Sequence, residues 1–122
     1  MMAKSLFIQQ VNANSIRNKK HEMQIILENY AKEGKMAIIL LNDTRLNDQD
    51  VLNFNGYYTL RRDHSSNTHR PGGVAAIVPN NVTTNEIAEF RNLEIETIGF
   101  EIDYEGRQMR IIRSYPHPGE EI

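Results

Sequence analysis

Polar side chains follow two predicted strands at the points where those strands end. Asn12 comes directly after the segment 5–11, and Asp43 closely follows the apolar run 36–41. If the two strands are neighbours in an open sheet, their carboxyl ends form the edge where ligands bind, and Asn12 and Asp43 face each other. An amide oxygen and a carboxylate are hard donors of the kind that hold Mg²⁺. The alternative is that both are loop caps, because Asn and Asp routinely bond nearby backbone.

Other residue types offer less chemistry. Gly72 and Gly73 precede a strand and permit a tight turn or close backbone approach, but no Gly-Lys-Ser/Thr of a Walker-type loop follows. No Ser-His-Asp or nucleophile-elbow pattern is present. None of the histidines has the paired spacing of a zinc site, so surface positions are expected. The histidines are His21, His64, His69 and His117.

Two clusters of basic residues could contact a nucleic-acid backbone. The net charge of the chain is −2, so it is not a uniformly basic nucleic-acid binder. Solvated surface is the simpler interpretation of both clusters. They consist of Arg17, Lys19, Lys20 and His21, and of Arg61, Arg62, His64, His69 and Arg70.

The elements that must position Asn12 and Asp43 are a strand, a helix and a second strand. The segment 5–11 is predicted to be the first strand. The run 36–41 is too short for a typical helix and rich in branched side chains, which favours a strand buried on both faces. Strand, helix, buried strand is the order of a crossover unit with parallel strands.

The helix between these strands is predicted from one apolar stripe. Ser15 or Asn18 could cap its start, and Gly34 suits its C-terminal cap. The stripe has the spacing i, i+3, i+4, i+7 of an amphipathic helix, and its members are Met23, Ile26, Leu27 and Tyr30.

The second half of the chain reads as antiparallel strands. Segments 57–61 and 74–78 are predicted strands, and the alternation of Ile98, Phe100 and Ile102 predicts a half-buried one. Glu105-Gly106 is a hairpin turn before a final strand over 108–115. The expected fold is therefore α+β or α/β, with one crossover helix and a mixed, mostly antiparallel sheet, in a single domain over residues 1–122.

The composition limits the classes of protein to which this chain can belong. Charged residues make up 25% and hydrophobic residues 39% of the chain, an ordinary globular balance. The absence of cysteine excludes disulfides and thiolate metal sites. The N-terminus lacks the apolar run of a signal peptide, and no apolar run is long enough to span a bilayer. An intracellular protein, nuclear or cytoplasmic, without a membrane partner is the expectation.

Five segments occur in a fixed order from about Leu6 to Pro118. They are VNANSIRNKKHE, IILLNDTRL, GYYTLRRD, PGGVAAIV and RIIRSYPHP. Together they resemble the start of the endonuclease domain of LINE-type (non-LTR) retrotransposons, closest to the jockey-like group. This domain belongs to the endonuclease/exonuclease/phosphatase superfamily.

The resemblance implies the N-terminal half of a two-sheet α/β sandwich of the DNase I-like type. It also implies Mg²⁺- or Mn²⁺-dependent cleavage of a DNA phosphodiester. By the resemblance Asn12 lies at the metal site, Asp43 is a metal ligand, and Tyr115 lies near the scissile phosphate. A reverse transcriptase domain would accompany the endonuclease in the parent element.

The sequence departs from the family in two positions. The family usually has glutamate where this chain has Asp43, and one methylene less shortens the reach by about 1.5 Å. Weaker metal binding is expected, because ligand distances are tight. Val11 replaces a tryptophan, which is a packing change. Arg62-Asp63 and Gly72-Gly73 match a segment associated with fold and loop placement.

A full domain of this family is about twice as long, and its second half holds an Asp-x-Asn pair and a Ser-Asp-His segment. The resemblance and the length of the chain leave three alternative functions. The chain belongs to a DNA endonuclease, or it is a truncated or degenerate copy without catalysis, or the fold serves a phosphatase or an RNA-directed nuclease. Half of a sandwich would also leave an apolar sheet face uncovered, which favours self-association.

Overall fold

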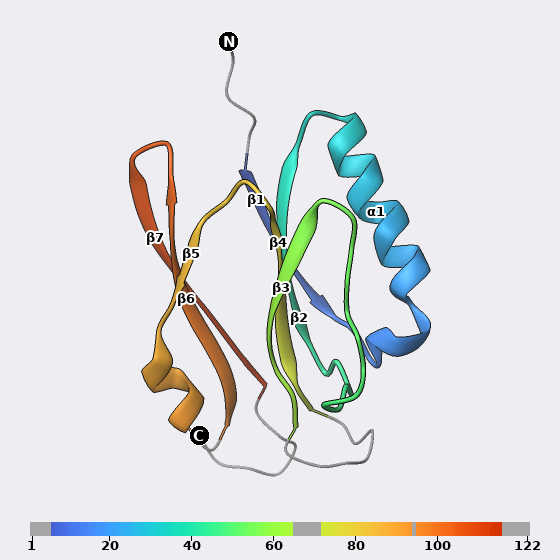
Figure 1. Ribbon diagram of the computed structural model, residues 1–122, viewed down its shortest axis with the longest axis vertical. Helices are drawn as coiled ribbons and strands as arrows, with labels where there is room; N and C mark the ends of the chain where they lie inside the picture. The colour runs from blue at the N-terminus through green and yellow to red at the C-terminus, as the bar shows by residue number, and fades with distance from the viewer. Residues whose placement is uncertain (1–5, 65–71, 94, 116–122) are drawn as a thin grey trace.

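The structure, a computed structural model, describes residues 6–64, 72–93 and 95–115. These residues form two β-sheets that pack face to face, with one α-helix on the outer side of the larger sheet (Figure 1). This is the predicted α+β architecture. In chain order the elements are β1 (Leu6–Asn12), η1 (Ile16–Asn18), α1 (Lys20–Lys32), β2 (Met36–Asn42), β3 (Tyr57–Arg62), β4 (Val74–Pro79), β5 (Thr84–Glu86), η2 (Ala88–Asn92), β6 (Glu96–Tyr104) and β7 (Arg107–Tyr115).

The larger sheet has the strand order β1-β2-β4-β3. β1 is parallel to β2, with Leu6 opposite Met36 and Asn12 opposite Asn42, whereas β4 is antiparallel to both β2 and β3. The chain passes from β1 to β2 through α1, so the predicted parallel crossover unit is confirmed. Every residue of β2 from Met36 to Leu41 is buried, which confirms the strand buried on both faces.

The apolar stripe of α1 faces the larger sheet only in part. Met23 and Leu27 are buried against it, and Tyr30 packs at the margin of the same cluster. Ile26 is 44% exposed, because it lies beside the edge strand β1 rather than over the centre of the sheet. Within the described residues, no helix is long and apolar enough to cross a membrane.

The two ends of α1 differ in how well the sequence predicts them. Gly34 has a φ of +72° and donates its N–H to the carbonyl of Ala31, the left-handed cap expected for glycine. The predicted N-caps are wrong. Lys19 occupies the N-cap position and its side chain makes no capping bond to the helix, because Ser15 and Asn18 cap and end the preceding 3₁₀ turn η1.

The smaller sheet has the order β5-β6-β7, and all its pairs are antiparallel. Glu105 and Gly106 have φ values of +53° and +77°, which suits a two-residue turn with both central residues left-handed, so the predicted hairpin is confirmed. β5 and η2 were not predicted from the sequence. β6 is also more buried than its half-buried pattern predicts, because Phe90 of η2 covers Gly99 on the outer face.

Two apolar cores hold the layers together. One lies between the two sheets and includes Ile38 and Leu40 from β2 and Phe100 from β6. The other lies between the larger sheet and a cover formed by α1 and the segment 44–56, which contributes Phe54. The expected uncovered apolar sheet face is therefore wrong for the described residues, since the central strands are covered on both sides. Exposed apolar side chains gather instead at the edge strand β1.

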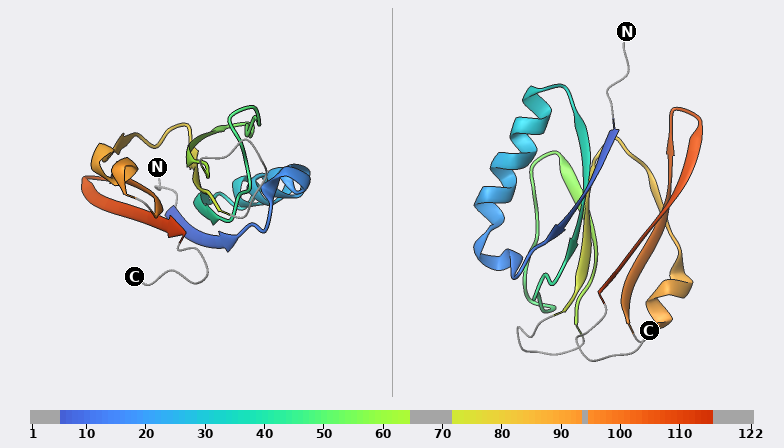
Figure 2. Two further views of the ribbon diagram at one scale, coloured as in Figure 1. Left: turned by 90° about the horizontal axis from the view of Figure 1, so that it is seen from below. Right: turned by 180° about the vertical axis from the view of Figure 1, so that it is seen from behind.

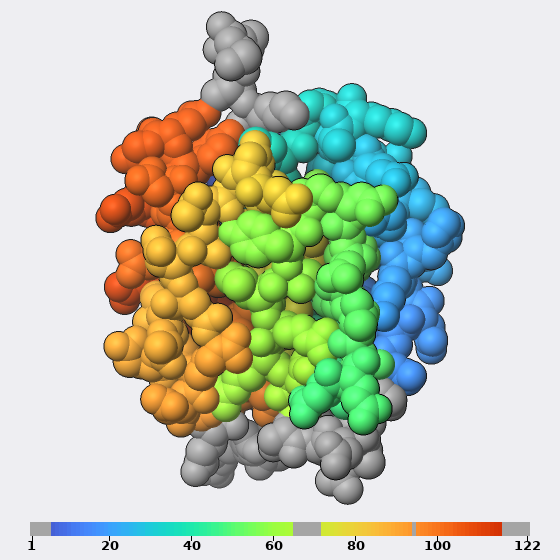
Figure 3. Space-filling view, in the orientation of Figure 1, coloured from blue at the N-terminus to red at the C-terminus, as the bar shows by residue number. Residues whose placement is uncertain are grey.

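Arg62 at the end of β3 ties the two sheets together. Its guanidinium donates to the backbone carbonyls of Phe90 at 2.9 Å and Ile95 at 3.2 Å, and also to that of Leu93. In Figure 3 the green segment containing β3 lies directly against the orange segment containing η2. Arg62 therefore satisfies carbonyls of a connection that forms few regular hydrogen bonds of its own.

Gly99→Ala is expected to lower the free energy of unfolding by about 1–3 kcal/mol, because overpacking forces neighbours to move. A Cβ at position 99 would lie 2.3 Å from Cδ2 of the Phe90 ring. Chemical denaturation of the wild type, Gly99→Ala, Phe90→Ala and the double variant measures the coupling. The alanine at 99 should cost less once the Phe90 ring is removed, and an equal cost in both backgrounds would contradict this packing.

Candidate metal centre at the carboxyl ends of β1 and β2

The carboxyl ends of β1 and β2 meet at one edge of the larger sheet. Asn12 and Asn42 are the last residues of these strands and lie opposite each other in the register. The ladder continues past them, because the N–H of Ala13 donates to the Asn42 carbonyl at 2.9 Å and that of Ser15 to the Asp43 carbonyl at 3.0 Å. The structure therefore places Asn12 and Asp43 on adjacent segments, as the sequence analysis expected.

Asn12 itself behaves partly as a loop cap. Its side-chain oxygen accepts the N–H of Asn14 at 3.3 Å, and the residue is exposed. This is the local bond that the alternative interpretation predicts for an asparagine after a strand. This bond is long, and the amide oxygen has a second lone pair that the bond does not use. Asn12 can therefore cap the loop and still offer its side-chain oxygen to a ligand.

Asp43 is buried, and hydrogen bonds reach both of its carboxylate oxygens. Oδ1 accepts the N–H of Gly72 at 3.0 Å and Nε of Arg45 at 3.2 Å, while Oδ2 accepts Nη2 of Arg45 at 3.1 Å. Asp43 and Arg45 both have left-handed backbone, with φ values of +58° and +57°. Such values are uncommon outside glycine, so the fold holds this pair in a costly conformation.

A second buried carboxylate, Glu96 at the start of β6, was missed by the sequence analysis. Its Oε1 accepts the N–H of Gly73 at 3.0 Å and lies 3.3 Å from Nδ1 of His64. His64 is therefore partly buried in a pair, which corrects the expected surface position; His21 is exposed as expected. His69 and His117 lie outside the described residues. The only sequence signal for Glu96 was an acid directly before an apolar strand.

The glycine pair links the two carboxylates. Consecutive N–H groups of Gly72 and Gly73 donate to Asp43 and Glu96 respectively. Gly73 has a φ of +90°, and a Cβ there would lie 2.4 Å from Oγ1 of Thr44. Both the backbone conformation and the close approach exclude a side chain at position 73. The pair thus holds two acidic side chains near each other.

Tyr115 lies at the end of β7, opposite Glu96 in the register of β6 and β7. Burial is the main reason that the pKa of its phenol is raised above the ordinary 10.0. The carboxylate of Asp43 raises the pKa further, Arg45 opposes this, and Glu96 adds to it. The Tyr115 phenol is therefore within electrostatic reach of Asp43, so the structure brings together these two residues from distant parts of the sequence.

The donor types at this edge fit a hard divalent cation. No group of three or more His, Cys, Asp or Glu side chains with metal-binding geometry occurs among the described residues. The side-chain oxygen of Asn42, however, is buried without a hydrogen-bond partner, between Asn12 across the sheet and Asp43 along the chain. An orphaned amide oxygen beside a carboxylate suits Mg²⁺, which takes few protein ligands and keeps several waters. In this structure the positive charge beside the Asp43 carboxylate comes from the guanidinium of Arg45.

The two basic clusters serve the fold in this structure. Lys19 donates through Nζ to the carbonyls of Ala13 at 2.7 Å and Asn14 at 3.2 Å, and Arg17 lies 3.4 Å from Asp50. In the second cluster the guanidinium of Arg61 bonds Asp63 and the Asn47 carbonyl, and Arg62 ties the sheets together. Both clusters are therefore more structural than the solvated surface expected. His69 and Arg70 lie outside the described residues.

The fold defines the class of protein: an α+β sandwich of a mixed four-stranded and an antiparallel three-stranded sheet, with polar groups at the carboxyl ends of its parallel strands. No family model matches the chain, and no curated protein matches it by sequence. A solved structure described as the endonuclease domain of TRAS1, a telomere-specific non-LTR retrotransposon, matches with a TM-score of 0.60 and 10% identity.

The match covers 91% of this chain and 44% of the TRAS1 domain. The chain therefore has the fold of about half of a DNase I-like endonuclease domain, which confirms the fold predicted from the five segments. At 10% identity the likeness concerns the fold alone.

Asp43→Asn is expected to lower the pKa of Tyr115, because the variant removes a negative charge that disfavours the phenolate and leaves the positive charge of Arg45 nearby. Tyrosinate absorbance is measured as the difference between each protein and its Tyr115→Phe counterpart. Asp103→Asn, which changes an exposed acid on β6, is the control. An unchanged pKa of Tyr115 in Asp43→Asn would contradict an electrostatic interaction between the two residues.

The raised pKa of Tyr115 also makes the stability of the fold depend on pH. Because the folded-state pKa of Tyr115 is raised above 10.0, the contribution of Tyr115 to the free energy of unfolding is fully present below pH 10.0. This contribution is lost as the pH rises through the raised value.

Proposed function

We propose that this chain is the metal-binding part of a Mg²⁺-dependent endonuclease domain that hydrolyses DNA phosphodiesters. The observation that carries the proposal is that Asn12, Asn42 and Asp43 gather at the strand ends of a fold that matches a retrotransposon endonuclease domain. Mn²⁺ would serve in place of Mg²⁺, since both prefer oxygen ligands. An intracellular location, nuclear or cytoplasmic, and a reverse transcriptase domain in the parent element accompany this proposal.

Each residue has a role that its surroundings support. Asp43 and Asn12 hold the cation, and the orphaned oxygen of Asn42 adds a third donor from the same edge. Tyr115 positions the phosphate: a phenol is protonated at neutral pH, and the raised pKa of Tyr115 preserves that state, so it can donate a hydrogen bond to a phosphate oxygen. When bound, Mg²⁺ supplies Lewis-acid stabilisation of charge on the phosphate.

The chain spans less than half the length of the TRAS1 domain that it matches. The groups that orient the attacking water therefore belong, in this proposal, to a complementary half. Without them most of the positioning and charge stabilisation is absent. The DNA substrate is likewise part of the proposal, and nothing in the described residues favours a phosphatase or an RNA-directed nuclease over it.

The second candidate function is a non-catalytic copy. One observation favours it: Arg45 contacts both oxygens of Asp43 and so competes with a divalent cation for that carboxylate. The two functions differ in whether the cation can displace Arg45.

Metal titration separates these alternatives. Arg45→Gln is expected to raise the affinity for Mn²⁺ by about tenfold, and Asp43→Asn to lower it by at least as much, since changes around a ligand alter metal affinity by about 10–100-fold. Isothermal calorimetry of both variants measures this, with Arg107→Gln at the exposed start of β7 as the control. If neither the wild type nor Arg45→Gln binds Mn²⁺, the chain has no metal site at Asp43.

Cleavage is tested on supercoiled plasmid. The chain joined to a complementary C-terminal half is expected to nick the plasmid with Mg²⁺ and to stop when a chelator is added. Asp43→Asn should reduce the nicking rate by about 100-fold, as loss of one charge-stabilising group does. A completed domain that folds and binds Mg²⁺ but leaves the plasmid intact would contradict the proposed function. Nicking by the 122-residue chain alone would exclude the non-catalytic alternative.

A further inference from the structure

Glu96 is a buried carboxylate at the point where the two sheets meet beside the candidate metal centre. It begins β6 of the smaller sheet and is only 6% exposed. Figure 2 shows the smaller sheet, in orange to red, as a layer separate from the larger sheet, in blue to yellow. Burying an ionised carboxylate is costly unless it is hydrogen-bonded, so the partners of Glu96 indicate its role.

The partners of Glu96 come from both sheets. Its Oε1 accepts the N–H of Gly73 at 3.0 Å and lies 3.3 Å from Nδ1 of His64. His64 follows β3 and Gly73 leads into β4, so one oxygen from the smaller sheet meets two points of the larger sheet. Within the smaller sheet Glu96 lies opposite Tyr115, and its charge helps to raise the pKa of that phenol. Glu96 is thus linked to both sheets at this edge.

The glycine pair that Glu96 holds lies directly against Asp43. The N–H of Gly72 donates to Oδ1 of Asp43 at 3.0 Å, and the N–H of Arg45 donates to the Gly72 carbonyl at 3.0 Å. These contacts continue the pairing of β2 with β4 past the last paired residues of both strands. The glycine pair is therefore the segment through which Glu96 can act on the Asp43 carboxylate.

This part of the chain lacks regular sheet geometry. Asp43 and Arg45 have φ values of +58° and +57°, and Gly72 and Gly73 have values of +132° and +90°. Costly non-glycine backbone of this kind persists only where the surrounding contacts over-determine it. Glu96 supplies such a contact from the other sheet, at the residue next to the one that bonds Asp43.

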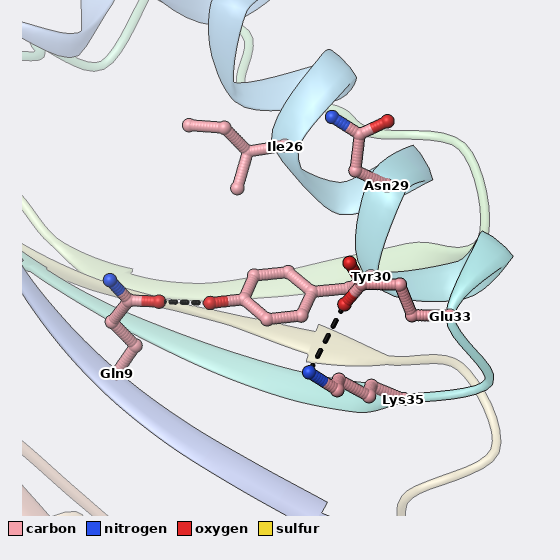
Figure 4. Close-up of a pocket in the computed structure, with 6 residues that line it drawn as sticks. All are labelled: Gln9, Ile26, Asn29, Tyr30, Glu33 and Lys35. Carbon is pink, nitrogen blue, oxygen red and sulfur yellow. Dashed lines mark hydrogen bonds and ion pairs between the residues drawn. The ribbon is translucent and has the colours of Figure 1, made fainter.

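Two other polar links in the fold do not involve the metal centre. Two hollows of about 390 Å³ and 210 Å³ lie between α1 and β1, and at the larger one the hydroxyl of Tyr30 donates to the side chain of Gln9 (Figure 4). The hydroxyl of Tyr58 on β3 donates to the Val82 carbonyl at 2.5 Å, and so joins β3 to the segment before β5. Such links serve as controls, because their loss should leave the metal centre unchanged.

We propose that Glu96 is a positioning residue of the metal centre. By holding the N–H of Gly73 it fixes the glycine pair, and the N–H of Gly72 then fixes the carboxylate of Asp43. Glu96 acts through these groups and is not itself a ligand of the cation. The groups behind a metal ligand orient it, and their loss weakens metal binding. The consequence for the metal rests on the proposed function, whereas the positioning of Asp43 is a property of the metal-free protein.

Hydrogen exchange of the Gly72 N–H, measured by NMR on the metal-free 122-residue chain, tests the positioning. Glu96→Ala removes the acceptor of the Gly73 N–H, so the Gly72 N–H is expected to exchange about tenfold faster. Glu96→Gln keeps an amide oxygen in the same place and should retain most of the protection. Tyr58→Phe removes the other link between the sheets and should leave the exchange at Gly72 unchanged.

Titration with Mn²⁺ extends the test to the cation. Glu96→Ala is expected to lower the affinity by about 10–100-fold, and Glu96→Gln by much less. Glu96→Asp keeps the charge but withdraws the oxygen by about 1.5 Å, so it should resemble the alanine variant. Equal losses in the alanine and glutamine variants, with none in Glu96→Asp, would overturn the inference, because charge rather than the hydrogen bond would then act on the cation.

The positioning role and the proposed function fail in different ways. Exchange at Gly72 that neither Glu96→Ala nor Glu96→Asp accelerates would overturn the positioning role, whatever the metal affinity. A wild-type chain that binds no Mn²⁺ would contradict the proposed function, and the exchange at Gly72 would then decide the positioning role by itself. The dichroism spectrum and thermal midpoint establish which variants are folded. If Glu96→Ala does not fold, the comparison of Glu96→Asp with Glu96→Gln gives the same decision.

Discussion

The burial of β2 on both faces is the constraint on which the rest of this structure depends. Ile39 and Leu41 pack under α1, while Ile38 and Leu40 pack against the smaller sheet. Each such side chain contributes about 1.5–3 kcal/mol when it leaves water, so this strand can occupy only the centre of the sandwich. Since β1 is parallel to β2 and in register with it, the polar residues after both strands must arrive at one edge.

That edge holds two buried carboxylates. Burying a carboxylate is costly unless it is paired and hydrogen-bonded. Asp43 meets this requirement through Arg45 and the N–H of Gly72, and Glu96 through His64 and the N–H of Gly73. Left-handed backbone at Asp43 and Arg45 adds a conformational cost. Charge and strain concentrated at one place are typical of functional sites rather than of ordinary loops.

The proposed metal centre lies where the larger sheet ends. Asn12 is the last residue of β1 and lines the smaller hollow beside that strand. In the TRAS1 match, this chain covers less than half of the domain, so in that protein other residues complete the fold.

The sequence by itself determined the elements whose signals are local. Continuous apolar residues gave β2, helical spacing gave α1, and the special backbone of Gly34 and Glu105-Gly106 marked a helix end and a hairpin. The order of these elements was enough to predict that Asn12 and Asp43 are neighbours, because a crossover connection makes the two strands parallel. The tertiary structure decided what lies around Asp43. Arg45, Gly72, Glu96 and Tyr115 reach the same edge only because the two sheets pack face to face, and contacts between distant segments leave no periodic pattern in the sequence.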